Sequence, residues 1–288
     1  MAAAAQTPLS SEFRWSSGAL YDSFVGRWSR LVAAEFVPWL GVQTGATWVD
    51  VGCGTGELTA AILRIAAPAR VISLDPSEGY LDHARASITD SRTEFRHGTD
   101  QDVRSLGLAA DAVVCGLVLN FVPDAVGALR AAAEVTATRG LIGAYVWDYA
   151  DQTTLLRHFW DAAVEEDPAA SNKDEGVRFP LCAADALTSA FEGAGLSSVV
   201  ERPIDVTDRF ANFEAYWTPF LSGEAPAPGY LATLPPDRQA KVKKLVMARI
   251  PVAADGSITL TCRAWAARGR LAPKANAQPH RPIRSLVV

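Results

Sequence analysis

Three glycines at alternate positions give the strongest chemical signal in the sequence. Gly52, Gly54 and Gly56 directly follow an apolar run that ends at Val51. Glycine tolerates positive φ angles and lets a ligand approach the backbone, and the N–H groups at the start of a following helix donate to polar ligands. Dinucleotide sites favour the spacing GxGxxG, but Glu57 stands where their third glycine falls. The loop therefore favours a ligand that lacks a pyrophosphate.

An acid closes the next apolar run. Asp75 follows Leu74 about 20 residues beyond the glycines, where a carboxylate is placed to accept hydrogen bonds from ribose hydroxyls. The alternative is that Asp75 caps the next helix, with Pro76 at its first position. Considered together with the glycine loop, ribose binding is the favoured interpretation.

Positioning these groups requires regular elements, and short β-branched runs alternate with amphipathic stretches along the first half of the chain. We expect strands at 47–51, 70–74, 93–96, 112–116 and 141–147. We expect helices at 20–40, 57–66, 77–86 and 124–136. Such alternation predicts a parallel sheet covered by helices on both faces, with ligands at the carboxyl ends of its strands.

The rhythm changes beyond Asp148. We expect a helix at 183–195, a strand at 197–205, two helices within 210–250 on either side of a Pro/Gly-rich segment at 223–236, and a last strand at 257–265. The expected regions are a helical lid (1–40), a core (41–207), a substrate cap insertion (208–255), a final core strand (256–268) and a flexible tail (269–288). The fold class is α/β, with a seven-stranded, mostly parallel sheet flanked by helices.

Composition narrows the function classes. The 288 residues are 49% hydrophobic and 20% charged, with a net charge of −5, and this acidic balance argues against nucleic-acid binding. The cysteines are scattered without a CxxC pair, which predicts buried free thiols and no metal site: Cys53, Cys115, Cys182 and Cys262. No basic leader or long apolar run indicates a signal peptide or a membrane span. We therefore expect a cytoplasmic protein without a membrane partner.

From Tyr21 to Tyr149 the sequence resembles the class I S-adenosylmethionine-dependent methyltransferases, in particular the group related to ubiquinone and menaquinone methyltransferases. The matching segments are 49–56, Asp75, the turn at 98–102 and the fourth strand with its exit at 113–124. Two positions depart from the family pattern. Thr99 occupies the usual Asp position of the adenine turn, and Asn120-Phe121 replaces a common histidine pair.

The resemblance implies a Rossmann-like fold, S-adenosyl-L-methionine as the cofactor, and methyl transfer to a small-molecule acceptor. Implied cofactor-binding residues are Asp50, Gly52, Cys53, Gly54, Gly56, Asp75, Pro76, Asp100, Gln101, Leu117, Tyr21 and Trp28. The loop glycines would approach the methionine part, Asp50 would support the loop or receive the amino group through water, and Asp75 would hold the ribose. Asp100 or Gln101 would face the adenine, and 117–120 would line the sulfonium region. Tyr21, Arg27 and Trp28 would form the lid, unless Trp28 packs in the core.

Methyl transfer from a sulfonium is an in-line displacement, so orientation can supply most of the catalysis. A general base is needed only when the acceptor holds its proton too tightly. Candidate catalytic contacts are Asp148 and Tyr149, directly after the fifth strand, and His158 on the next helix, for which a surface position is the alternative.

The second half of the chain is rich in aromatic residues that either pack the cap or line a pocket for an apolar or aromatic metabolite. They are Trp147, Tyr149, Phe159, Trp160, Phe179, Trp217 and Phe220. Lys173 or Arg178 would instead select a carboxylate. Three other functions stay open: non-methylating chemistry such as a cofactor-assisted cyclisation, methylation of protein or nucleic acid, and an oxidoreductase or idle binding module. The oligomeric state is expected to be a monomer or a homodimer.

Overall fold

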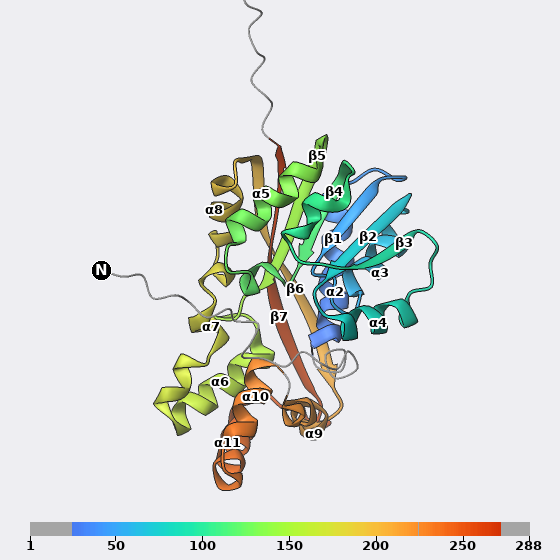
Figure 1. Cartoon of the computed structure of the whole chain (residues 1–288). Helices are drawn as coiled ribbons and strands as arrows, with labels where there is room; N and C mark the ends of the chain where they lie inside the picture. Colours follow the sequence, from blue (N-terminus) through green and yellow to red (C-terminus); the bar gives the residue numbers. More distant parts are fainter. Residues whose placement is uncertain (1–24, 224, 272–288) are drawn as a thin grey trace, which may run out of the picture.

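A seven-stranded sheet forms the centre of the molecule in the computed structural model, which describes residues 25–223 and 225–271 (Figure 1). The strand order is β3-β2-β1-β4-β5-β7-β6, and β7 alone runs antiparallel to its neighbours. The strands are β1 Thr47–Val51, β2 Arg70–Asp75, β3 Thr93–His97, β4 Ala110–Gly116, β5 Thr136–Trp147, β6 Leu196–Phe210 and β7 Ile258–Leu271. The expected α/β class with a mostly parallel seven-stranded sheet is confirmed.

Helices cover both faces of this sheet. The α-helices of the described residues, which include those of the cap, are α2 Arg27–Leu40, α3 Glu57–Ile65, α4 Glu78–Ser87, α5 Ala125–Val135, α6 Thr154–Glu166, α7 Glu175–Arg178, α8 Ala186–Gly193, α9 Phe213–Trp217, α10 Pro226–Thr233 and α11 Pro236–Arg249. Neighbouring residues of a strand point to opposite faces. In β7, the Arg268 guanidinium donates to the Leu40 carbonyl of α2, at 3.2 Å, whereas Gly269 faces Phe191 of α8. Helices α2 and α8 therefore cover opposite faces.

The sheet ends in a ribbon that carries a helical cap. Strand β5 pairs with β7 only from Ala264 to Arg270, whereas β6 pairs with β7 along its whole length, so the ribbon of β6 and β7 extends beyond the sheet. Helices α9, α10 and α11 lie between these two strands in the sequence and contact the cap helix α6 or the ribbon. Figure 1 shows these helices together below the sheet.

The structure differs from the sequence predictions in the length of β7 and in the number of cap helices. Strand β7 continues to Leu271, so residues 269–271 belong to the sheet and not to a tail. The Pro/Gly-rich segment holds helix α10, so the cap has three helices in place of two. Proline is tolerated in the first turn of a helix, where its missing N–H has no intrahelical partner, and Pro226 begins α10 in this way. Tyr21 and most of the proposed lid lie outside the described residues.

Within the two described ranges, no helix combines the length and the apolar character needed to cross a membrane. The four cysteines are buried free thiols, as the sequence predicts.

Candidate cofactor and acceptor site

The glycine loop adopts the conformation that its sequence predicts. Gly52, Gly54 and Gly56 have φ angles of 72°, 54° and 93°, all in the left-handed region that favours glycine. A Cβ on Gly52 would lie 2.3 Å from the Cγ2 atom of Val118, so the β4 exit packs directly on the loop. A Cβ on Gly54 would meet no atom within 4 Å, because this residue borders a cavity.

Asp75 joins the ends of the first two strands. Its Oδ2 atom accepts from the backbone N–H of Gly54 and its Oδ1 atom from that of Ser77, both at 2.9 Å. Burial raises the pKa of this carboxyl, while the two backbone bonds oppose the rise. Ser77, not Asp75, is the N-cap residue of α4 and accepts from the Tyr80 N–H. The carboxylate keeps further lone pairs for a ligand, and Asp75 lines the cavity.

Asp50 lies beneath the loop and is fully buried. Its Oδ2 atom accepts from the Thr59 hydroxyl at 2.7 Å, whereas Oδ1 has no hydrogen-bond partner among the described residues. Burial raises the pKa of Asp50 to about 7. A small hollow of about 40 Å³ beside Asp50 and Cys53 is large enough for one ordered water or a small polar group. The unpaired oxygen thus has room for a donor.

The turn after β3 presents only part of its predicted surface to the cavity. Thr99 and Asp100 line the cavity, whereas Gln101 does not. The Gln101 side chain is exposed and bonds to Asp100 and to Arg104. The Thr99 hydroxyl donates to the Asp102 carboxylate at 2.9 Å, which shapes the turn. Of the two adenine contacts that the sequence left open, the structure brings only Asp100 to the cavity.

The exit of β4 is held in an unusual backbone conformation. Leu117 has a φ of 61°, which is costly for a residue with a branched side chain, and its N–H donates to the Tyr145 carbonyl at 2.8 Å. Leu117, Val118 and Phe121 line the cavity, but the buried Asn120 does not. The expected stretch 117–120 therefore contributes its first two residues.

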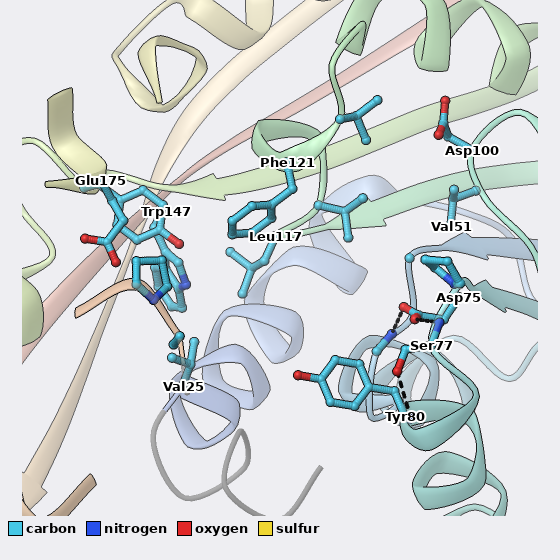
Figure 2. A pocket seen from close by; sticks show the side chains of 18 of the residues that line it. Val25, Val51, Asp75, Ser77, Tyr80, Asp100, Leu117, Phe121, Trp147 and Glu175 are labelled. Atoms are coloured by element: carbon cyan, nitrogen blue, oxygen red, sulfur yellow. Dashed lines mark hydrogen bonds between the residues drawn. The ribbon is translucent and has the colours of Figure 1, made fainter. Parts of the chain in front are cut away.

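The loop glycines Gly52 and Gly54, Asp75, Asp100 and Leu117 all border one cavity of about 430 Å³. Figure 2 shows Asp75, Tyr80 and Asp100 at one end, Glu175 and Trp147 at the other, and Leu117 and Phe121 between them. Most of the lining is apolar, and its charged side chains are three carboxylates: Asp75, Asp100 and Glu175. No Lys, Arg or His in the described parts of the chain lines it.

This arrangement fits S-adenosylmethionine, whose sulfonium and ammonium groups outweigh its one carboxylate and give it a net positive charge. A cation is stabilised by nearby carboxylates and destabilised by other cations, and the cavity offers only the former. The unpaired Asp50 oxygen and the open face of Gly54 leave space where a donor and a ligand chain can approach.

The lid residues of α2 are anchored to the body of the protein. Trp28 is fully buried within the hydrophobic core and also borders the cavity, so core packing and cavity lining coincide in one side chain. Arg27 forms an ion pair with Asp208 and lies over the Phe210 ring, with its Cζ atom 4.6 Å from the ring centre. This part of the proposed lid is tied to β6.

The three predicted catalytic contacts separate in the structure. Tyr149 lines the cavity, whereas Asp148 and His158 do not. The Asp148 carboxylate accepts from the Asp151 N–H at 3.2 Å, and burial raises its pKa. Burial lowers the pKa of His158, which lies on α6 near Asp161. His158 is half-buried and is not part of the cavity lining.

Most of the predicted aromatic set packs the cap. Trp147 and Tyr149 line the cavity, but the other members do not. Phe220 stacks on Phe159 with ring centres 5.0 Å apart, and Phe179 packs on Tyr149 at 5.8 Å. The proposed carboxylate-selecting residues Lys173 and Arg178 are also absent from the lining.

Sequence reasoning missed Glu175. It lies in a charged segment that reads as a solvent-exposed face, yet only 2% of its surface is exposed. Its carboxylate accepts from the Trp160 indole N–H and lines the cavity. Asp174, a typical N-cap residue directly before it, is the one local signal that a helix begins there.

Comparison with known proteins agrees with this site. Residues 49–143 match the family model described as a methyltransferase domain. The demethylmenaquinone methyltransferase of Halalkalibacterium halodurans is 33% identical over 107 residues, which are 36% of this chain and 44% of that protein. The trans-aconitate 2-methyltransferase of Methylobacterium radiotolerans is 29% identical over 179 residues, 60% of this chain and 67% of that protein.

Solved structures show the same fold. Phosphoethanolamine N-methyltransferase 2 of Haemonchus contortus, in complex with phosphomonomethylethanolamine and S-adenosylhomocysteine, aligns with a TM-score of 0.53 at 13% identity and covers 88% of this chain and 57% of that one. The expected resemblance to methyltransferases is thus confirmed over the matched domain, residues 49–143, and the solved structures share the fold. The chain spans less than half the length of the demethylmenaquinone methyltransferase that it matches, and the family model lies in the first half of this chain.

Proposed function

We propose that this protein is an S-adenosylmethionine-dependent methyltransferase that methylates a small apolar or aromatic metabolite by in-line displacement. The observation that carries the proposal is the single cavity that joins the glycine loop and Asp75 to the apolar walls formed by Trp147, Tyr149 and the cap. A cofactor at one end and an acceptor at the other would share this space.

S-adenosylmethionine supplies an electrophilic methyl carbon when bound. The backbone at Gly52 and Gly54 would hold its methionine part, Asp75 its ribose, and Asp100 its adenine. Leu117 and Phe121 lie between the two ends and would exclude water from the region where the methyl group is transferred. Holding the acceptor in line supplies the main rate enhancement. No described histidine lines the cavity, so the proposal requires no histidine base.

Two measurements test this function. Calorimetric titration of the protein with S-adenosylhomocysteine should give saturable binding at one site. Incubation with methyl-labelled S-adenosylmethionine and a fractionated metabolite extract should move label into a small organic product. Binding of NAD(P) without binding of S-adenosylhomocysteine would overturn the proposal in favour of an oxidoreductase.

The alternatives make different products. A cofactor-assisted cyclisation would change a metabolite without incorporating label, and methylation of protein or nucleic acid would place the label in macromolecules. A cap over the cavity and an acidic net charge of −5 favour the small-molecule function. The expectations of a cytoplasmic location and of a monomer or homodimer stay predictions.

A further inference from the structure

We propose that Glu175 selects the methyl acceptor by accepting a hydrogen bond from its hydroxyl or amino group, so that the cavity takes neutral or cationic acceptors and excludes carboxylates. This inference rests on the proposed function and names its substrate class. It concerns the cap end of the cavity, away from Asp75 (Figure 2).

Two neighbouring groups fix the position of Glu175. Asp174 caps α7 by accepting from the Gly176 N–H at 2.8 Å, and it forms a buried ion pair with Arg157, in which Nη2 lies 2.6 Å from Oδ2. Arg157 also donates to the Tyr149 carbonyl at 3.1 Å. These bonds attach the start of α7 to α6 and to the exit of β5, and hold the Glu175 side chain at the cavity.

The surroundings of Glu175 compensate its charge only in part. Its Oε2 atom accepts from the Trp160 indole, which is a neutral donor. The Arg157 guanidinium favours the charged form of Glu175, but its hydrogen bonds go to Asp174. Burial is the main cause that raises the pKa of Glu175 to about 7. A buried carboxylate without a cationic partner is costly, and a donor on the acceptor would reduce this cost.

The same charges disfavour an anionic acceptor. Asp75, Asp100 and Glu175 are the charged side chains of the lining in the described ranges. The other groups at the cap end are uncharged and mostly apolar or aromatic, among them Trp147, Tyr149, Leu155, Leu156 and Pro226, with Thr153 as a polar exception. A carboxylate placed there would lose its hydration, face a second carboxylate and find no cation. The fitting acceptor is an apolar body that carries a hydroxyl or an amine.

Three small probes with one apolar body test the inference. Binding of 4-ethylphenol, of its methyl ether and of 4-ethylbenzoate to the protein with S-adenosylhomocysteine is followed at pH 8 through tryptophan fluorescence, since Trp147 lines the cavity. The phenol should bind at least about tenfold more tightly than either of the other probes, the factor expected from one buried hydrogen bond to a charged group.

Glu175→Gln supplies the decisive comparison. The oxygen of the introduced amide can keep the bond from Trp160, so the amide NH₂ would face the cavity as a donor. The phenol-to-benzoate preference should fall at least about tenfold. The matched control Glu192→Gln, at an exposed position of α8, should leave all affinities unchanged.

Several outcomes overturn the inference. The inference is wrong if the unmodified protein binds the benzoate as tightly as the phenol or more tightly, or if it shows no measurable binding of the phenol. It is also wrong if Glu175→Gln keeps the phenol-to-benzoate preference of the unmodified protein. If that variant does not fold, the unmodified protein's ranking of the three probes decides alone. Binding of S-adenosylhomocysteine is measured separately by calorimetry. If the protein does not bind this molecule, the affinities of the three probes are compared on the protein alone. Loss of cofactor binding therefore counts against the proposed function, and a wrong ranking counts only against Glu175.

Discussion

The cofactor end of the cavity is formed largely by backbone, whereas the cap end is formed by side chains from distant segments. At the cofactor end, the loop at 52–56 and Asp75 lie close in the sequence, and the Gly54 backbone N–H donates to the Asp75 carboxylate. The cap end collects Trp147, Glu175 and Pro226, which are far apart in the chain. The shape of the cofactor end therefore depends on backbone φ angles and local residue spacing, whereas the shape of the cap end depends on tertiary packing.

The largest expected effect is at the cofactor end. Gly54→Val should weaken S-adenosylhomocysteine binding by at least about a thousandfold, or about 4 kcal/mol, because its side chain would enter the cavity and its φ of 54° disfavours a β-branched residue. Calorimetric titration measures the affinity. The control is Gly45→Val, which has a φ of 76° and open space but lies away from the cavity. Equal losses in both variants would assign the effect to backbone strain alone.

The second prediction tests whether the stability of the cap and the binding of S-adenosylhomocysteine are independent. Phe220 is fully buried in the cap and stacks on Phe159. Phe220→Ala should lower the free energy of unfolding by about 3–5 kcal/mol through the cavity it leaves, while S-adenosylhomocysteine affinity changes less than about threefold. Urea denaturation and calorimetry give the two numbers. A parallel fall in affinity would show that the ends are not independent.

The buried acid of the cap should make stability depend on pH. Folding raises the pKa of Glu175 from 4.5 to about 7. Below pH 4.5 the side chain is protonated in both the folded and the unfolded state, so its titration costs no stability. Between these pH values the unfolded state releases the proton first, and the free energy of unfolding falls as the pH rises. Above pH 7 the full cost, roughly 3 kcal/mol, is present. Glu175→Gln should therefore gain stability over the unmodified protein at pH 8 but not at pH 4.5. The same gain at both pH values would contradict this.

A smaller effect is expected at the ribose contact. Asp75→Ala should weaken S-adenosylhomocysteine binding by about 1–3 kcal/mol, because it removes buried hydrogen bonds. The control Asp82→Ala changes an exposed acid of α4, whose side chain is 75% accessible. An unchanged affinity in Asp75→Ala would remove this residue from the site.

The smallest expected effect distinguishes the contributions of Gln101 and Asp100 to the binding of S-adenosylhomocysteine. Gln101→Ala should change S-adenosylhomocysteine affinity less than about twofold, since its exposed amide lies outside the lining and surface substitutions are mostly near-neutral. Asp100→Ala should weaken binding more than Gln101→Ala in the same titration. The reverse order would restore Gln101 as the adenine contact.

The comparison also explains what the sequence could predict. Strands β1 to β4 and the loop glycines follow from local apolar runs and from the need for positive φ, and the structure places them close to expectation, whereas β5 begins at Thr136, before its predicted start at 141. Strand β6 extends to Phe210, five residues past its predicted end, because pairing with β7 continues beyond the sheet. No local pattern encodes the length of that pairing.

The cap end was harder to predict because the orientation of its side chains depends on packing. Asp148 follows β5 directly, yet its carboxylate turns to the Asp151 backbone, while Tyr149 faces the cavity. Glu175 stands among charged residues, and it becomes a cavity residue only because Arg157 and Asp174 attach α7 to α6. These contacts join separate segments and leave no spacing pattern.

The paired ribbon has a consequence for how such a protein can diversify. Phe210 and Ile258, where the chain leaves β6 and enters β7, are opposite each other in the ladder. The intervening polypeptide thus starts and finishes at neighbouring points, and its replacement by another of different length would leave the strand order intact. New acceptor preferences can arise there by exchange of a whole segment, without any change in the nucleoside-binding residues.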